Sequence, residues 1–308
     1  MKNAIEISNL YKKYDKLEAV KNLTLKIEVG EFYGMLGPNG AGKSTTINSI
    51  TGYVKPTSGQ INILSKDIEK EFRFTRSKIG IAQQEISNDW FFPIEDLLFF
   101  QAGFYGINKT SATKNIRNLL AQMGLEQHKR KKMRSLSGGM KRRFQIAKAL
   151  VHDPEILILD EPTAGVDVEL RHELWDFLRS LHQKGKTVLL TTHYIDEAEL
   201  LCSKVGIIND GKLITEGTVS ELKNTIKKSS IVIKIREGQN PSFDQILKEY
   251  KWAYGNQELI ISSESPNSDL PILINTISSS NIKIDDIQLP KTSLEDVFLK
   301  LTGKKIDD

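Results

Sequence analysis

The residues best suited to chemistry form a glycine-rich run that can hold phosphate. The run Gly37-Pro38-Asn39-Gly40-Ala41-Gly42-Lys43-Ser44-Thr45 fits the P-loop pattern, in which glycines let the backbone turn and point a row of N–H groups at phosphate oxygens. Lys43 would neutralise the β and γ phosphates, and Ser44 would hold Mg²⁺. The largely apolar run 31–36 predicts a buried strand before the glycine-rich run, and residues 44–51 predict a helix after it. Strand, glycine loop and helix are the context that a P-loop requires.

Two carboxylates follow a second apolar run. Residues 156–159 are all apolar and lead directly into Asp160 and Glu161. In α/β sheets, ligand sites lie at the carboxyl ends of the strands. Asp160 is therefore the candidate for the Mg²⁺-water shell, and Glu161 is the candidate that orients or deprotonates an attacking water.

A second candidate for phosphate binding is Leu136-Ser137-Gly138-Gly139-Met140, which opens a predicted helix over residues 138–151. Free N–H groups and the helix dipole at such a start favour an anion. A serine cap followed by glycines is also an ordinary structural feature. Its occurrence together with the P-loop favours phosphate binding.

The charge of the chain is close to balanced. Its 308 residues carry 43 Lys and Arg against 39 Asp and Glu, a net charge of +4. This mild excess does not resemble a dedicated nucleic-acid binder. The densest basic residues lie at 129–134 and 141–143. A solvated helix end and first turn is the favoured interpretation, and attraction to anionic lipid or to ATP is the alternative.

Cysteine content and hydropathy indicate the compartment. Cys202 is the single cysteine, so no intramolecular disulfide can form, and we expect a buried thiol in a reducing compartment. The first residues lack the apolar stretch of a signal peptide, and no window reaches 18 uninterrupted apolar residues. We therefore expect that the chain does not cross a membrane by itself.

The elements that must position these residues are predicted from hydrophobic periodicity. Residues 5–10 and 23–27 alternate apolar and polar and predict an antiparallel edge sheet. A helical subdomain, at about residues 87–150, is predicted from three helical patterns at 93–104, 112–123 and 138–151. Apolar strands at 156–159, 187–190 and 205–208, with a helix at 169–184, predict a parallel sheet covered on both faces. Asn209-Asp210-Gly211-Lys212 predicts a hairpin.

The composition shifts to Lys, Ser and Asn after residue 221. We therefore predict a nucleotide-binding domain at 1–224 and a small α+β domain at 225–308. The pattern of the second domain indicates a ferredoxin-like βαββαβ unit. Its predicted strands are 231–235, 252–254, 258–262 and 282–287, and its predicted helices are 242–250, 269–279 and 293–301.

The helical subdomain carries two apolar clusters, Trp90-Phe91-Phe92 and Leu97-Leu98-Phe99-Phe100. The favoured interpretation is subdomain core. The alternative is that some of these residues line a groove that receives a helix of a membrane partner.

With these motifs in order, residues 1 to about 222 resemble the ATP-binding subunit of an ABC transporter. The resemblance implies an α/β P-loop NTPase core with an antiparallel edge sheet and an inserted helical subdomain. The family's positions fall on the P-loop 37–45, the glutamine-loop residue Gln84, the signature Leu136 to Met140, the acidic strand 156–161, the D-loop Ala164 to Asp167, the switch His193, and Tyr14. Gln83 leaves the glutamine register open by one residue, and the preceding residues 79–82 favour Gln84.

The resemblance implies a role for each position, with ATP and Mg²⁺ as cofactors. Tyr14 would stack on adenine, His193 would hydrogen-bond the γ-phosphate, and Gln84 would contact Mg²⁺ with Ser44 and Asp160. Ser137, Gly138 and Gly139 would bind the γ-phosphate of ATP held by a second copy, so that two ATP molecules join a homodimer. Asp167 would couple the two sites.

Departures from the common pattern narrow the subfamily. Met140 replaces the usual glutamine of the signature, and Ala164-Gly165 replaces a Ser-Ala pair. These variants, with Thr292-Ser293-Leu294-Glu295-Asp296-Val297-Phe298-Leu299, resemble ATPases of ABC-2 type exporters. The resemblance implies a separate ABC-2 permease as partner, a peripheral position on the cytoplasmic face of the cell membrane, and no nucleic-acid partner.

Other classes of P-loop protein fit the sequence less well. A chromosome or DNA-repair ABC ATPase needs a long heptad insertion, which residues 46–135 do not contain. A ribosome-acting ABC ATPase normally carries two copies of the domain. A P-loop kinase or GTPase would leave Leu136 to Met140 and His193 without a purpose.

Overall fold

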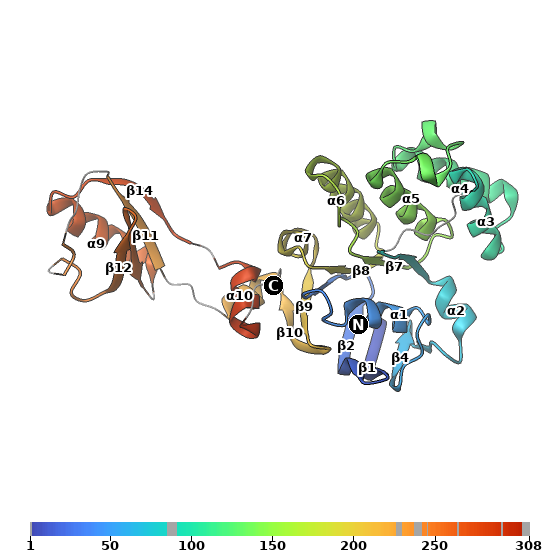
Figure 1. The fold of residues 1–308 in the computed structure, drawn as a ribbon, viewed down its shortest axis with the longest axis horizontal. Coiled ribbons are helices and arrows are strands. Elements are labelled where there is room, and N and C mark those ends of the chain that lie inside the picture. Colours follow the sequence, from blue (N-terminus) through green and yellow to red (C-terminus); the bar gives the residue numbers. More distant parts are fainter. Residues whose placement is uncertain are drawn as a thin grey trace. The chain divides into compact units, whose positions relative to one another are not determined.

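The chain folds into two units. The computed structural model describes residues 2–84, 91–225, 230–236, 242–244, 246–263, 265–290 and 292–303. One unit consists of Met1–Val219 together with the chain from Phe298 onward, and the other is Ser220–Val297 (Figure 1). The predicted domain organisation, 1–224 and 225–308, stays a prediction, and the structure adds that the last helical residues belong with the first unit.

A six-stranded sheet lies at the centre of the first unit, in the order β10-β9-β3-β8-β7-β6. Its strands are β3 (Phe32–Leu36), β6 (Ile79–Ala82), β7 (Ile156–Asp160), β8 (Thr187–Thr192), β9 (Lys204–Asn209) and β10 (Lys212–Thr218). Strands β9, β3, β8, β7 and β6 pair in parallel. Strand β10 returns antiparallel to β9 through the predicted hairpin. The parallel sheet and the hairpin are therefore confirmed.

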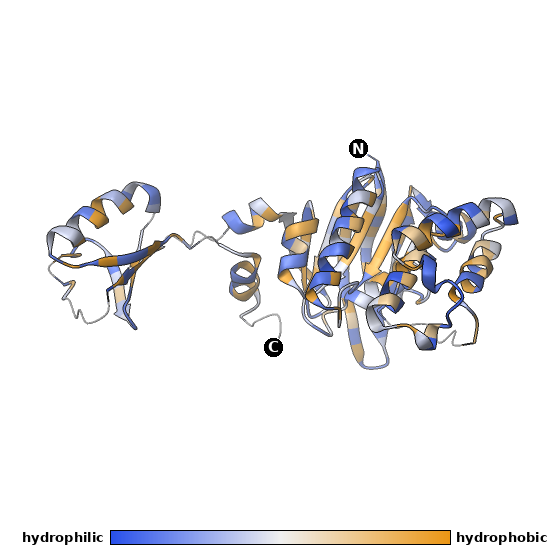
Figure 2. Ribbon diagram, turned by 90° about the horizontal axis from the view of Figure 1, so that it is seen from above, coloured by the Kyte–Doolittle hydropathy of each residue, from blue (hydrophilic) through white to orange (hydrophobic). Residues whose placement is uncertain are grey.

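The inner strands of this sheet are buried along their whole length. Every residue of β3, β7 and β8 is buried, as expected for parallel strands covered on both faces. Figure 2 shows hydrophobic residues along the strands and both kinds of residue along the helices around them. In Figure 1, α1 (Lys43–Ile50) lies on one side of the sheet, and α5 (Gly138–Leu150) and α6 (Val168–Gln183) lie on the other.

A four-stranded antiparallel sheet, in the order β2-β1-β4-β5, forms the second layer of this unit. Its strands are β1 (Asn3–Tyr14), β2 (Leu17–Glu28), β4 (Ser58–Ile63) and β5 (Lys66–Asp67). The pairing of β1 with β2 confirms the predicted edge sheet, and β4 and β5 were not predicted. One core cluster joins both sheets through residues such as Ile5, Leu25, Met35 and Ile158. This shared core fixes the strand that precedes the P-loop.

The helical subdomain contains the three predicted helices. They are α3 (Ile94–Phe104), α4 (Lys109–Gln122) and α5, which pack on one another. Two short turns, η1 (Glu126–His128) and η2 (Met133–Ser135), lead into α5. The unit also has α2 (Phe72–Ser77), α6, α7 (Ile195–Leu201) and the start of α8 (Val219–Asn224).

The aromatic residues of this subdomain correct one prediction. Leu97 and Leu98 are buried, as the core interpretation requires. Phe91, Phe92 and Phe100 are 78%, 48% and 49% exposed, so the core interpretation is wrong for them. The two leucines occupy the inner face of α3, which turns the side chain of Phe100 outward. Trp90 lies outside the described residues.

The second unit is a small α+β fold. Its sheet has the order β12-β13-β11-β14, and all its pairs are antiparallel. Its elements are β11 (Ser230–Ile235), β12 (Lys251–Gly255), β13 (Glu258–Ser262), α9 (Pro266–Ser279) and β14 (Ile284–Gln288). The last helix among the described residues is α10 (Leu294–Thr302). These strands and α9 confirm most of the predicted elements.

One predicted helix of the second unit is wrong. The described residues of 242–250 form turns and not a helix. The four-residue spacing of Phe243 and Leu247 favours a helix, but one turn with a bond from Leu247 N to Phe243 O is enough to bury both side chains. The βαββαβ unit thus lacks its first helix within the described residues.

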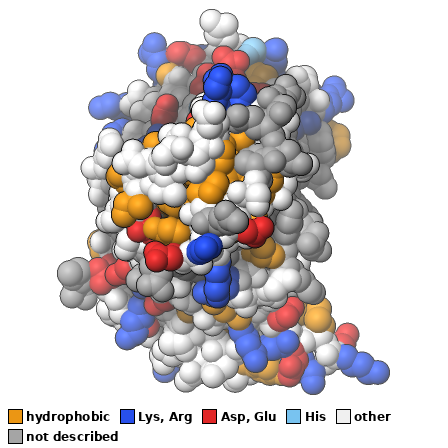
Figure 3. All heavy atoms as spheres, turned by 90° about the vertical axis from the view of Figure 1, so that its left-hand side faces the viewer, with side chains coloured by type: hydrophobic (Ala, Val, Ile, Leu, Met, Phe, Trp, Pro, Cys, Tyr) orange, Lys and Arg blue, Asp and Glu red, His pale blue; other side chains and the backbone are white. Residues whose placement is uncertain are grey.

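The surface of the molecule has hydrophobic and charged areas. On the face drawn in Figure 3, hydrophobic side chains gather near the middle, and charged side chains of both signs lie around them. The most exposed large hydrophobic residues of the second unit are Ile260 and Ile272. None of the helices in the described parts of the chain is long and apolar enough to span a bilayer.

Candidate nucleotide-binding site

The P-loop connects β3 with α1, as the sequence predicts. Strand β3 ends at Leu36 and α1 begins at Lys43. Gly42 has a φ of 101°, and a Cβ atom at this position would lie 2.5 Å from the carbonyl oxygen of Ala19. Both the left-handed backbone and the close approach therefore require glycine.

Lys43 lies inside its own loop. Its Nζ donates hydrogen bonds to the carbonyl oxygens of Gly37 (2.7 Å) and Pro38 (3.1 Å), and it lies 3.4 Å from Glu161 Oε1. The side chain is 4% exposed. Burial lowers the pKa of Lys43, and the negative charge of Glu161 opposes this shift. The ammonium group is thus held where the backbone of the loop can receive phosphate oxygens.

Glu161 is the centre of the site. It follows β7 directly, with a φ of 48°, and its N–H donates to the Thr191 carbonyl oxygen (3.0 Å). Its Oε2 accepts a hydrogen bond from Gln84 Nε2 (3.0 Å). His193 Nδ1 lies 3.2 Å from Oε1 without the alignment of a hydrogen bond. The structure therefore brings Lys43, Gln84 and His193 together around one carboxylate.

Oxygen ligands suitable for Mg²⁺ lie beside this carboxylate. Asp160 is 6% exposed, and its Oδ1 accepts a hydrogen bond from Thr191 Oγ1 (2.5 Å). Ser44 is exposed in the first turn of α1. Gln84 uses its amide nitrogen for Glu161, so its amide oxygen is left as a possible ligand. Mg²⁺ binds few protein oxygens and completes its coordination shell with phosphate and water. The oxygens of Ser44, Asp160 and Gln84 are suitable protein ligands for such a site. Among the described residues, no group of three or more His, Cys, Asp or Glu side chains has an arrangement that could hold a metal ion on its own.

Tyr14 is placed at the end of a strand. It is the last residue of β1 and is 40% exposed. Lys12 Nζ lies 4.7 Å from the centre of its ring. Stacking of this ring on adenine stays a prediction.

The signature residues form the start of α5. The Ser137 side chain caps the helix by accepting a hydrogen bond from Met140 N (3.3 Å), and Ser137 and Gly138 are exposed. Asp167 caps α6 in the same way, through Leu170 N (3.0 Å). Within the described residues, no hydrogen bond or ion pair joins Ser137, Gly138, Gly139 or Asp167 to the cluster around Glu161. Within one chain, the two phosphate-binding candidates are therefore not joined by hydrogen bonds or ion pairs of these residues.

Three residues of the site were missed by sequence reasoning. They are Arg142, Thr191 and Glu197. Arg142 is 5% exposed, so its interpretation as part of a solvated first turn is wrong. The spacing of Arg142, Ile146 and Ala149 on one face of α5, where all three are buried, is a signal that would have indicated this. Glu197 is fully buried, and its Oε1 accepts hydrogen bonds from Thr163 Oγ1 and Trp175 Nε1 (both 3.1 Å). Burial raises the pKa of Glu197.

The fold and the site together define a P-loop ATPase with an inserted helical subdomain. A family model described as ABC transporter matches residues 20–164. The chain is 34% identical over 312 residues to the linearmycin resistance ATP-binding protein LnrL of Bacillus subtilis (strain 168), covering 99% of this chain and 100% of that protein. This chain belongs to the ABC transporter ATP-binding family, and it is an ATPase.

Two further similarities agree with this assignment. The Nod factor export ATP-binding protein I of Burkholderia thailandensis is 34% identical over 304 residues, with 99% of this chain and 98% of that protein covered. A solved dimeric structure of the ATP-binding cassette MJ0796, bound to ADP and Pi, has a TM-score of 0.65 and 28% identity. It covers 70% of this chain and 98% of that cassette. The fold class predicted from sequence is confirmed.

Proposed function

We propose that this chain is the ATP-hydrolysing subunit of an exporter whose membrane part is a separate ABC-2 type permease, bound at the cytoplasmic face of the membrane. Two observations support the direction of transport. The relative from Bacillus subtilis is named for linearmycin resistance, and the relative from Burkholderia is named for Nod factor export. Both match nearly the whole chain, including the second unit. Neither name supports the alternative of a nucleic-acid or ribosome ATPase.

The observation that carries the proposal is the convergence of Lys43, Gln84 and His193 on Glu161. In this proposal Glu161 accepts a proton from the attacking water, whose oxygen forms a bond to the γ-phosphorus while the bond to the ADP oxygen breaks. Lys43 and the loop N–H groups bind the phosphates, and His193 donates toward the developing charge. Mg²⁺, held by Ser44, Asp160 and Gln84, would neutralise charge on the β and γ phosphates.

The proposal includes a head-to-tail homodimer with two shared sites. Ser137 and Gly138 are exposed at the start of α5, and among the described residues no hydrogen bond or ion pair joins them to the cluster around Glu161 of their own chain. A helix start with free N–H groups favours a phosphate. A second copy can supply that phosphate, since a related cassette is known as a dimer. Asp167, at the start of α6, would lie beside this contact.

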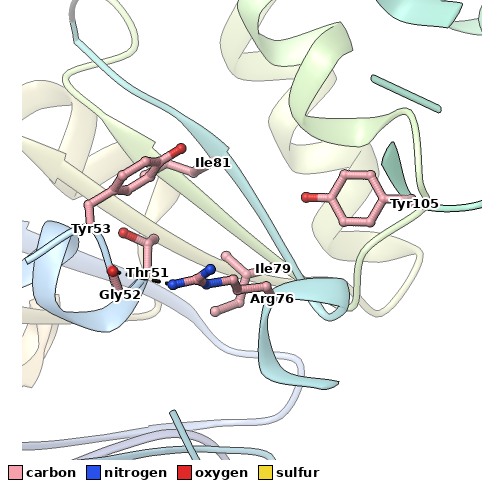
Figure 4. A pocket seen from close by; sticks show the side chains of 7 residues that line it. All are labelled: Thr51, Gly52, Tyr53, Arg76, Ile79, Ile81 and Tyr105. Carbon is pink, nitrogen blue, oxygen red and sulfur yellow. Dashed lines mark hydrogen bonds between the residues drawn. The ribbon is translucent and has the colours of Figure 1, made fainter. Parts of the chain in front are cut away.

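The docking site for the permease would be a pocket beside β6, the strand that precedes Gln84. Figure 4 shows its lining side chains, which come from the end of α1, from α2, from β6 and from the end of α3. They are Thr51, Gly52, Tyr53, Arg76, Ile79, Ile81 and Tyr105. A second pocket shares Tyr53, Ile81 and Tyr105 and continues to Gln83. The two pockets together form one groove, and its lining residue Gln83 directly precedes Gln84, which contacts Glu161.

The experiment that tests the shared sites mixes two inactive variants. Lys43→Ala removes phosphate binding, and Ser137→Arg blocks the helix start. Two subunits, one of each kind, contain one intact composite site, so we expect ATPase activity to return to at most half of the wild-type rate. The control mixes Lys43→Ala with a Lys43→Ala/Ser137→Arg double variant and has no intact site. Full recovery, or no recovery, in the first mixture would refute sharing between subunits.

A further inference from the structure

Arg142 is a buried arginine with an unusual set of partners. It lies in the second turn of α5, after Ser137, and is 5% exposed. Its Nε donates to the Pro162 carbonyl oxygen (2.7 Å), its Nη1 to the Gln83 carbonyl oxygen (2.6 Å), and its Nη2 to the Asp160 carbonyl oxygen (2.5 Å). Nη1 also donates to Gln145 Oε1 (2.9 Å) on the same helix. The planar guanidinium thus uses its fork to bind three distant backbone carbonyl groups.

Each of these carbonyl groups belongs to a segment that carries a catalytic side chain. Gln83 immediately precedes Gln84 at the end of β6. Asp160 and Pro162 are the residues before and after Glu161, at the end of β7. The two strands already pair in parallel, with Ala82 opposite Leu159. One side chain of the signature helix therefore joins the carboxyl ends of both strands.

Burial of the Arg142 charge costs desolvation free energy, so the side chain would not be buried here without specific hydrogen bonds. A buried guanidinium is tolerated only when hydrogen bonds replace its water. Burial lowers the pKa of Arg142 to about 10, while the nearby carboxylates of Asp160, Glu197 and Glu161 raise it. The group stays charged at neutral pH and binds the carbonyl oxygens as a cation, which strengthens each hydrogen bond.

We propose that Arg142 is a positioning residue that ties the signature helix to the catalytic ends of β6 and β7 in the same chain. It holds Gln84 and Glu161 in their relative places. When the start of α5 binds the phosphate of the other subunit, a shift of α5 passes through Arg142 to the catalytic carboxylate of its own subunit. The second part of this inference rests on the shared sites proposed above.

The first test is the conservative variant Arg142→Lys, which keeps the charge but loses the planar fork. We expect kcat for ATP hydrolysis to fall by about tenfold or more, because small misplacements of catalytic groups are costly. We expect KM for ATP to change by less than about threefold, since Lys43 and the P-loop are untouched. The matched control is Arg117→Lys, which alters an arginine of the same subdomain that is 79% exposed and pairs with Glu126.

A purely structural role predicts a different result. The melting temperature of Arg142→Lys would fall, and kcat per folded molecule would equal that of the wild type. That outcome, or a loss of affinity with unchanged kcat, would overturn the proposal. If Arg142→Lys does not fold, Arg142→Gln, which is neutral and shorter but keeps an amide donor, is measured in the same way.

The second test asks in which subunit Arg142 acts. Two differently tagged copies are purified through both tags, and one copy carries Glu161→Gln, so that only one Glu161 is intact. Arg142→Lys is placed either in the subunit with the intact Glu161 or in the other one. We expect the larger loss of rate in the first arrangement. Equal loss in both arrangements would refute positioning within the chain. If the proposed sharing of sites is wrong, the Lys43→Ala and Ser137→Arg mixture shows no recovery, while Arg142→Lys alone still lowers kcat.

Discussion

Gln84 donates a hydrogen bond from its side-chain amide to Glu161 over a distance of 3.0 Å, although the two residues are 77 positions apart in the chain. Gln84 follows β6 and Glu161 follows β7, and these strands are neighbours in the sheet. The carbonyl group of the preceding residue, Gln83, is held by Arg142. The Glu161 carboxylate is therefore connected both to the groove beside Gln83 and to α5.

The role proposed for Glu161 predicts the effect of a neutral replacement. Glu161→Gln should bind ATP but lose about 10²- to 10⁴-fold in turnover, because the amide cannot accept the proton of water. The nucleotide-bound dimer should then accumulate, which gel filtration with ATP detects. Glu155→Gln alters a half-exposed glutamate paired with Lys78 and serves as the control. Near-normal hydrolysis by Glu161→Gln would remove this residue from its assigned role.

Replacement of Lys43 should weaken ATP binding as well as lower the rate of hydrolysis. Lys43→Ala removes the ammonium group that lies within the loop, so ATP affinity should fall by at least tenfold, as measured by calorimetry. Lys55→Ala, at a lysine that is 80% exposed, should bind ATP as the wild type does. Unchanged affinity in Lys43→Ala would contradict the P-loop assignment.

If the permease docks at the pocket drawn in Figure 4, a charge placed in this pocket should weaken docking. Tyr53 is 67% exposed and belongs to both pockets. Tyr53→Asp places a charge on this surface and should reduce the amount of permease that co-purifies from detergent-solubilised membranes. Val29→Asp changes a residue that is 51% exposed in the loop between β2 and β3 and should leave co-purification intact. Equal recovery of the permease with both variants would place the docking site elsewhere.

His152 predicts a dependence of stability on pH. Burial lowers its pKa from the ordinary 6.5, its ring stacks on Tyr105 at 3.6 Å, and its Nε2 lies 3.0 Å from the Ile79 carbonyl oxygen. Below the ordinary value, the unfolded chain takes up a proton that the folded chain does not. The contribution of His152 to stability is therefore complete above this value and falls as the pH decreases.

The measurement compares melting temperatures at about pH 7.5 and about pH 5.5. The wild type should lose more on acidification than His152→Phe, which keeps an aromatic ring beside Tyr105 but cannot titrate. An equal loss in both proteins would show that His152 does not contribute to the acid sensitivity.

The sequence predicted most elements of the first unit because their patterns are local. The apolar run before Asp160 predicted β7, and the glycines around Lys43 predicted the turn between β3 and α1. The sequence failed where a neighbouring element decides the outcome. Residues 242–250 have helical spacing but form turns, and Phe100 is apolar but exposed. Strand β4 was not predicted because its first residues are all polar or glycine, so apolar and polar residues do not alternate along it. Its pairing with β1 defines it as a strand.

The sequence by itself determined the family and the chemical types of the site residues. The glycines around Lys43, the acidic pair Asp160 and Glu161, and His193 stand in the order that the family's motifs have. Only the tertiary structure decided which of them meet. Neighbouring strands bring Gln84 to Glu161, and the burial of one face of α5 places Arg142 against three carbonyl groups. The physical reason is that motif order depends on covalent neighbours, whereas hydrogen bonds between distant segments depend on how the sheet and helices pack.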